Sequence, residues 1–210
     1  MPPPSSTTAN PRTTVAILAK APVPGFAKTR LIPSIGAHAA AALQERLTEQ
    51  AVAAALGAAI GPVTLWAAPD ARHPSFVTMV IQQRIALRPQ PDGDLGARML
   101  AAMDGPTLVI GTDCPALTPL HLRGAARALH EGAEVVLIPA EDGGYVLIGT
   151  RTAQPALFSG IAWGTATVLA ETRARIMARS LVLNEMPPLW DVDTEDDLAR
   201  MEREMPSLSL

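Results

Sequence analysis

The chain has 210 residues, of which 48% are hydrophobic, so it holds enough apolar sequence to bury a sizeable core as one domain. Its formal net charge of -3 gives no support for a nucleic-acid partner. The single cysteine excludes an intrachain disulfide and is compatible with a reducing cytosol, so we expect a cytoplasmic protein.

The N-terminal stretch differs in composition from the rest of the chain. Residues 1–13 are rich in Pro, Ser and Thr and predict a disordered tail, followed by a single domain over residues 14–205. The apolar run after the tail stops at Lys20 and is too short for a secretory signal. Residues 51–69 carry no charge, but they are mostly Ala and Gly and contain a Gly-Pro pair. We expect a helix end and a strand there, and no membrane span.

Strand-like and helix-like segments alternate along the chain, which is typical of an α/β fold. Short apolar runs predict strands over residues 14–19, 63–67, 84–87, 107–110, 134–138, 145–148 and 181–183. Helical patterns cover residues 37–56, 75–83, 95–103, 119–130, 165–178 and 194–205. The loop between the fifth and sixth strands is too short for a helical crossover, so those two strands should be joined directly. We expect an α/β sandwich with a mixed, mostly parallel sheet.

The strand predicted at residues 107–110 delivers a carboxylate, Asp113, just beyond its C-terminal end. Ligands of open α/β sheets bind at this edge, and a carboxylate there suits a divalent cation that holds phosphates. The alternative is that Asp113 caps the helix that follows. Further along, Thr194 is followed three residues later by an aspartate and predicts the cap of the last helix. Asp191 and Asp193 precede that helix and remain free to reach the sheet edge.

The only two lysines, Lys20 and Lys28, lie in one proline-rich loop after the first strand. An ammonium is a compact point charge suited to phosphate, and Arg30 adds a guanidinium that can bind phosphate through two hydrogen bonds. The alternative is that both lysines are solvated surface residues. The loop matches neither G-x-x-x-x-G-K-[ST] nor G-x-G-x-x-G, which disfavours P-loop and dinucleotide-binding folds.

The loop before the sixth strand combines Glu141, Asp142, Gly143, Gly144 and Tyr145, the only tyrosine. A tight acidic turn explains an Asp-Gly pair by itself. Two glycines directly before a strand also allow close approach to the backbone, so we favour a functional loop that contacts substrate.

Two further turns are candidates for the same edge. In the first, Asp94 fits a helix cap, Gly96 would permit close approach of a ligand, and Arg98 would add positive charge. In the second, Trp163 and Thr165 could line a substrate pocket, although Trp163 fits the core equally well.

Taken in order, these segments resemble one family, the glycosyltransferase-like proteins associated with radical-SAM and selenodomain genes. The matching pieces are AKAPVPGFAKTRL, DLGARM, GTDCPALT, AEDGGYVLIG, WGT and DVDTEDDL, which together extend from residue 15 to about residue 198. More distantly, the chain resembles the molybdenum-cofactor nucleotidylyltransferases and 2-phospho-lactate guanylyltransferase.

The resemblance implies the A-type glycosyltransferase fold, a Rossmann-like three-layer sandwich of the nucleotide-diphospho-sugar transferase type. It also implies Mg or Mn carried by Asp113, and a nucleotide-activated donor. The chain departs from the fold's usual D-x-D, because Asp113 stands between Thr112 and Cys114. A second metal ligand must then come from elsewhere, with Asp191 or Asp193 the best candidates.

Our hypothesis is a metal-dependent transferase, in the first place a glycosyltransferase that uses a nucleotide-diphospho-sugar. Phosphate or nucleotide contacts would come from Lys20, Lys28, Arg30, Gly96 and Arg98, and metal contacts from Asp113, Asp191 and Asp193. Glu141 or Asp142 would position or deprotonate an acceptor of unknown identity, in a pocket lined by Gly143, Gly144, Tyr145, Trp163 and Thr165. The alternatives are a nucleotidylyltransferase acting on a phosphorylated small molecule and a non-catalytic nucleotide-binding module. A homo-oligomer is compatible with the sequence.

Overall fold

The structure, a computed structural model, describes residues 12–208. The tail expected at the N-terminus falls, for residues 1–11, outside this range. Thr13 is fully buried, and its N–H donates to the carbonyl of Ile60 at 3.1 Å. Across the described range, no helix is both long and apolar enough to cross a membrane.

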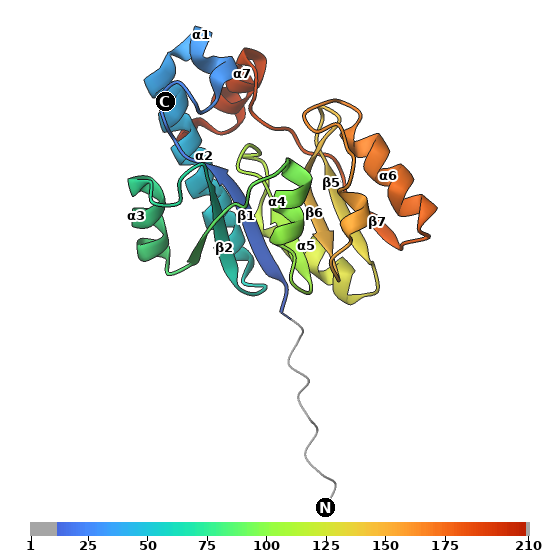
Figure 1. The fold of residues 1–210 in the computed structure, drawn as a ribbon. Helices are drawn as coiled ribbons and strands as arrows, with labels where there is room; N and C mark the ends of the chain where they lie inside the picture. The colour runs from blue at the N-terminus through green and yellow to red at the C-terminus, as the bar shows by residue number, and fades with distance from the viewer. Residues whose placement is uncertain (1–11, 209–210) are drawn as a thin grey trace, which may run out of the picture.

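Seven strands form one sheet in the order β3-β2-β1-β4-β6-β5-β7 (Figure 1). The strands are β1 (Thr14–Lys20), β2 (Val63–Ala68), β3 (Ala86–Pro89), β4 (Thr107–Ile110), β5 (Val135–Pro139), β6 (Tyr145–Thr150) and β7 (Leu183–Glu185). Only β6 runs antiparallel to its neighbours, and it joins β5 directly through a short loop. The prediction of a mixed, mostly parallel sheet is confirmed.

Helices cover both faces of the sheet (Figure 1). They are α1 (Ile32–Ile35), α2 (Ala37–Ala58), α3 (Pro74–Gln83), α4 (Leu95–Ala101), α5 (Pro119–His130), α6 (Val168–Ala178) and α7 (Glu195–Glu204), with short 3₁₀ turns at Thr29–Leu31, Pro155–Leu157 and Pro206–Leu208. The α2, α3 and α5 helices pack into one apolar cluster, and α4 and α6 into the other. The chain therefore forms a three-layer sandwich.

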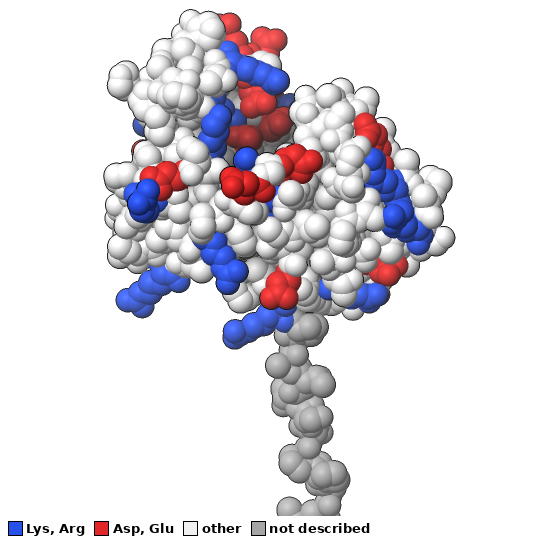
Figure 2. All heavy atoms as spheres, viewed as in Figure 1, with Lys and Arg blue, Asp and Glu red and all other residues white. Residues whose placement is uncertain are grey.

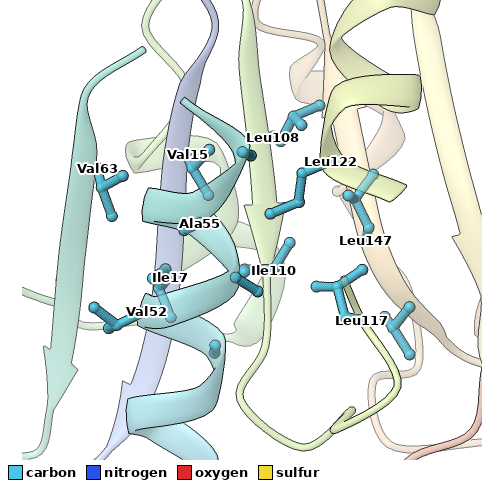
Figure 3. Packing of buried hydrophobic residues seen from close by; sticks show 14 of the residues in the cluster. Val15, Ile17, Val52, Ala55, Val63, Leu108, Ile110, Leu117, Leu122 and Leu147 are labelled. Carbon is cyan, nitrogen blue, oxygen red and sulfur yellow. The ribbon is translucent and has the colours of Figure 1, made fainter. Parts of the chain in front are cut away.

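The two clusters arise from the two-residue period of the strands. Val15 and Ile17 of β1 point toward α2, as Figure 3 shows, while Ala16 between them belongs to the opposite cluster. All four residues of β4 and all five of β5 are buried, as expected for strands covered on both faces.

Three elements begin two or three residues later than predicted, for local reasons. The strand predicted at 84–87 is β3 at 86–89, because Arg84 adopts a left-handed conformation (φ 54°) at the end of α3. The strand predicted at 181–183 is β7 at 183–185, because Ser180 (φ 52°) ends the preceding helical segment in the same way. The helix predicted from residue 165 begins at Val168, after a turn. Such reversals depend on single residues that periodicity does not detect.

A third apolar cluster holds a small lobe above the C-terminal edge of the sheet. It joins the first half of α2 to α7 and the segment before α7, through Leu31, Leu43, Leu47, Trp190, Val192, Leu198 and Met201. Figure 1 shows α1 and α7 side by side in this lobe. The lobe fixes two loops over the strand ends, one after β1 and one before α7.

The predicted cap of α7 is confirmed. The Thr194 side chain accepts from the N–H of Asp197 at 3.4 Å, and the Asp197 carboxylate accepts from the N–H of Thr194 at 2.8 Å. This reciprocal capping box satisfies two backbone donors at the start of the helix.

Replacing Thr194 with alanine should lower the free energy of unfolding by about 1 kcal/mol, because the first turn of α7 loses its cap. Urea denaturation of the full chain measures this loss. Thr78→Ala is a matched control, since Thr78 is an exposed residue within α3, where alanine favours the helix. Equal stability of the Thr194→Ala variant and the unmodified chain would contradict the capping role.

Candidate active site

The candidate site lies at the C-terminal edge of the sheet, where β1 pairs with both β2 and β4. The loops after β1 and β4 meet there beneath the lobe of α1 and α7. Figure 2 shows Lys, Arg, Asp and Glu side chains gathered around a hollow between this lobe and the strand ends. This is the edge at which parallel α/β sheets bind ligands.

Lys28 forms the centre of the site with a buried ammonium group. Its Nζ is ion-paired with Asp113, lies 3.3 Å from the Asp193 carboxylate, and donates to the carbonyl of Val192 at 2.6 Å. Its side chain is 4% exposed. The alternative of a solvated surface lysine therefore does not hold for Lys28, although Lys20 is exposed.

Two costs accompany this placement of Lys28. Burial disfavours its charged form, but the carboxylates of Asp113 and Asp193 outweigh that penalty and raise the pKa of Lys28 above its usual value. Its backbone is left-handed, with φ 45° and ψ 46°, which costs a non-glycine residue about 1 kcal/mol. The ammonium therefore stays charged at neutral pH in a strained loop.

Asp113 does not cap the helix after it. The N-cap of α5 is Thr118, whose side chain accepts from the N–H of His121. Asp113 instead stays half exposed, and its backbone carbonyl accepts from the N–H of Val192 at 2.9 Å. The strand-end loop and the segment before α7 are thus joined by both a backbone bond and the shared ammonium of Lys28.

The cationic side of the site continues through Arg30 and Lys20. Arg30 lies 3.3 Å from Asp193, and 71% of its side chain is exposed. A cavity of about 200 Å³ here is lined by Lys20, Lys28, Thr29, Arg30, Gln44, Asp113 and Asp193. Such a set of cations around a small space suits phosphate groups.

A larger cavity of about 660 Å³ adjoins the ends of β1 and β2. It is lined by Leu18, Ala19, Lys20, Ala21, Val23, Phe26, Ala68, Pro69, Gln90, Pro91, Asp92, Leu95 and Arg98. Because Lys20 lines both this cavity and the cationic one, the two adjoin at that side chain. The combination is a mostly apolar chamber that leads to a charged end.

An acidic pocket of about 280 Å³ lies on the other side of Asp193. It is lined by Arg30, Glu141, Asp142, Trp190, Asp191, Asp193, Thr194 and Asp197. Glu141 accepts from the Arg200 guanidinium at 2.9 Å, and that guanidinium lies over the Trp190 ring at 4.7 Å. Asp142 accepts from the backbone N–H of Gly144 at 2.8 Å. Glu141 is therefore neutralised, whereas Asp142 has no cationic partner within residues 12–208.

Asp191 is a carboxylate of this pocket whose pKa is strongly raised. Burial is the largest cause, and repulsion from Asp142, Asp193 and Asp113 adds to it; together they raise the pKa of Asp191 to about 6. Lys28 and Arg30 pair with Asp193, so Asp191 has no cation against it among the residues that the structure describes.

The donor set fits a divalent cation of the kind that shares its shell with phosphates. Within residues 12–208, no group of three histidine, cysteine, aspartate or glutamate residues forms a ready-made metal cage. Mg²⁺ needs none, because one or two carboxylates, water and substrate phosphates complete its octahedral shell. Asp113 and Asp191 are electrostatically coupled carboxylates with hard oxygen donors. As the second carboxylate, Asp191 is favoured over Asp193, because Lys28 and Arg30 already bind Asp193, while Lys28 also pairs with Asp113.

Several predicted site glycines contact protein. A Cβ on Gly96 would lie 2.6 Å from the carbonyl of Phe158 and 2.7 Å from the Trp163 ring, so the close approach there is between α4 and its neighbours. Gly143 has φ 93°, and a Cβ there would overlap the backbone of Ala166. The glycines at these positions are explained by packing. The hydrogen bond from Gly144 to Asp142 adds a tight turn.

The other predicted substrate contacts lie away from the cationic cavity. Tyr145 packs in the cluster of α4 and α6, with its hydroxyl 3.9 Å from the sulfur of Met99, and burial raises its pKa. Trp163 packs in the same cluster, although its buried indole N–H has no partner in the described part of the chain. Thr165 donates to the carbonyl of Ala162 at 2.8 Å. Arg98 donates to the carbonyl of Gly93 at 3.1 Å and lines the large cavity.

Three residues of the site escaped sequence reasoning. Arg200 holds Glu141 from 59 residues away, and Gln44 of α2 donates to Thr112 from 68 residues away. Neither pairing leaves a local pattern in the sequence. Phe26, by contrast, lies inside the motif that follows the first strand, and an aromatic residue beside a glycine in a loop could have marked it.

Replacing Lys28 with methionine should lower the free energy of unfolding by about 1–3 kcal/mol. The apolar stem stays buried, but Asp113 and Asp193 lose the charge between them; both are partly solvated, which limits the loss. Chemical denaturation at neutral pH measures the change. Arg30→Met is the matched control, because Arg30 pairs with the same Asp193 from an exposed position, and it should change stability by no more than about 0.5 kcal/mol. Equal changes in the free energy of unfolding for the two variants would contradict a stabilising role of the buried Lys28 ion pairs.

Several solved structures share this architecture. The chain is 28% identical to a "putative nucleotide-diphospho-sugar transferase" from Desulfovibrio desulfuricans G20, with a TM-score of 0.80 over 92% of this chain and 88% of that one. It also shares its fold with 4-diphosphocytidyl-2C-methyl-D-erythritol synthase from Anaerococcus prevotii DSM 20548, at 11% identity and a TM-score of 0.62 over 93% and 96% of the two chains. Glucosyl-3-phosphoglycerate synthase from Mycobacterium tuberculosis, solved with Mn²⁺ and UDP, has 13% identity and a TM-score of 0.55 over 94% and 78%.

The expected nucleotide-diphospho-sugar transferase fold is thereby confirmed. No curated protein matches the chain by sequence. A family model does match residues 39–165, more than half of the chain. The chain belongs to that family, described as an uncharacterized protein conserved in bacteria (DUF2064).

Proposed function

We propose that this protein is a metal-dependent transferase that moves a glycosyl group from a nucleotide-diphospho-sugar to a small acceptor. Within its family, we assign it to the glycosyltransferase-like type associated with radical-SAM and selenodomain genes. The observation that carries the proposal is the apolar cavity of about 660 Å³ that leads, past Lys20, to the cations Lys28 and Arg30. An apolar chamber with a few polar groups and a charged end suits a nucleoside attached to phosphates.

The donor side of the reaction uses the cations of the loop after β1. The nucleoside would occupy the large cavity, and its phosphates would extend past Lys20 toward Lys28 and Arg30. The Lys28 ammonium already has three acceptors, Val192 and two carboxylates, so it orders this end of the cavity, while Lys20 and the exposed Arg30 keep free donors for phosphate. Charges that are already fixed stabilise a leaving diphosphate without further reorganisation.

Asp113 and Asp191 would hold the metal, which we take to be Mg²⁺ or Mn²⁺. When bound, the ion neutralises negative charge on the donor phosphates and on the leaving group. Asp193 would have a structural role, because it binds Lys28 and Arg30 of the loop after β1. The Mn²⁺ in the complex of glucosyl-3-phosphoglycerate synthase supports the use of a divalent cation on this fold.

The acceptor side of the reaction falls to the acidic pocket next to Asp193. Arg200 already binds Glu141, so that carboxylate is engaged in an ion pair within the protein. Asp142 has no cationic partner in the described chain and is the better candidate to position and deprotonate an acceptor hydroxyl. Arg200 then acts as a positioning residue that fixes the loop bearing both carboxylates.

Nucleotidyl transfer from a nucleoside triphosphate is the second candidate, because cytidylyl-type synthases share the fold. The proline-rich first loop favours glycosyl transfer, since a glycine-rich loop would offer more backbone N–H donors to a triphosphate. The products separate the two reactions. Glycosyl transfer releases a nucleoside diphosphate, whereas nucleotidyl transfer releases pyrophosphate.

Replacing Asp113 with asparagine should weaken Mn²⁺-dependent nucleotide binding by at least about tenfold, because one of two metal carboxylates is lost. Titration calorimetry of nucleoside diphosphates, with and without Mn²⁺, measures the effect. Asp104→Asn is the control, since Asp104 is exposed and outside the site. Full metal-dependent binding by the Asp113→Asn variant would remove the central assignment, and binding without any metal dependence would favour the non-catalytic module.

A further inference from the structure

We propose that the large cavity selects guanine nucleotides, with Asp92 and Arg98 reading the base and Phe26 stacking on it. This inference rests on the proposed function, because it names the base of the donor that the cavity would hold. It depends on the walls of the cavity and on the side chains there that remain free for a ligand.

Two large apolar side chains line the cavity while facing solvent. Phe26 is 68% exposed and Leu95 is 43% exposed, and both are lining residues. They come from different segments, the loop after β1 and the first turn of α4. Apolar side chains left uncovered at a cavity mark a binding surface, and an aromatic ring there offers a face on which a base can stack. Stacking alone does not distinguish one base from another.

Four polar or charged side chains line the cavity: Lys20, Gln90, Asp92 and Arg98. The Gln90 amide already donates to the carbonyls of Ala19 and Trp66, at 3.1 and 2.9 Å, and so forms part of the wall. Lys20 also lines the cationic cavity, where phosphates would bind. Asp92 and Arg98 are left to read the base.

Asp92 and Arg98 line the same cavity and carry complementary groups, an acceptor and a donor. Arg98 uses its Nε to bind the carbonyl of Gly93, the residue next to Asp92, at 3.1 Å. This bond holds the guanidinium against the turn that carries Asp92 and leaves both terminal nitrogens available. Among the described residues, neither the Asp92 carboxylate nor those terminal nitrogens has a hydrogen-bond or ion-pair partner.

Guanine matches this pair of groups on two edges. Its N1–H and N2 amino group are adjacent donors, which a carboxylate can accept together, and its O6 and N7 are adjacent acceptors, which a guanidinium binds in bidentate fashion. Adenine offers an acceptor at N1, which the Asp92 carboxylate would repel. Uracil presents one donor between two acceptors, and cytosine presents one amino group next to the acceptor N3, so neither offers two adjacent donors. Guanine is therefore the base whose hydrogen-bond pattern both side chains satisfy.

The experiment is a calorimetric titration of the full chain with GDP, ADP, CDP and UDP, each with Mn²⁺. We expect GDP to bind at least about tenfold more tightly than the other three, which is the discrimination that one bidentate base contact provides. Asp92→Asn and Arg98→Gln should each reduce this preference while leaving the Mn²⁺ dependence intact. Phe26→Ala should weaken all four ligands by a similar factor.

Asp104→Asn and Arg151→Gln are matched controls, because both residues are exposed and line none of these cavities. Thermal unfolding of each variant shows that it is folded. Metal-dependent binding that favours another base, or a guanine preference unchanged in Asp92→Asn and Arg98→Gln, would overturn the inference and leave the proposed function standing. Failure of all four nucleotides to bind would overturn both.

Discussion

The candidate site depends on one buried ammonium, that of Lys28, which joins three parts of the chain. Asp113 comes from the end of β4, Val192 and Asp193 from the segment before α7, and Lys28 itself from the loop after β1. The nearest pair of these segments, at positions 113 and 192, is 79 residues apart, so only the folded sheet brings them together. Removing the charge of Lys28 leaves Asp113 without its cationic partner at the edge where ligands bind.

The apolar lobe and the polar site depend on each other. Trp190 and Val192 are buried in the cluster that anchors α7 to α2, while the residues between and beyond them face the acidic pocket. Alternation along this extended segment therefore sends apolar side chains into the lobe and carboxylates toward the site. Arg200 extends the same coupling, since it covers the Trp190 ring and binds Glu141.

Sequence reasoning identified the elements better than it identified contacts. Buried strands such as β4 and β5 can be recognised in the sequence as apolar runs. The cap of α7 is also recognisable, because its two residues, Thr194 and Asp197, lie within four positions of the sequence. The direct ion pair between Lys28 and Asp113 had no such local signature, so the sequence predicted a phosphate ligand and a metal ligand as separate groups. Gly96 illustrates the opposite limit, because a glycine required for packing is indistinguishable in sequence from one required by a ligand.

Stability alone does not explain why a lysine occupies position 28. A buried ion pair is often no more stable than apolar side chains of similar size, and this one also sits on a left-handed backbone. Two costs at one residue persist when the surrounding structure enforces them, and such residues cluster at functional sites. Here the enforcing contacts are those of Asp113, Val192 and Asp193. Lys28, fixed in this way, orders the cavity that Lys20 and Arg30 also line, and the free donors of those two cations suit an anionic ligand.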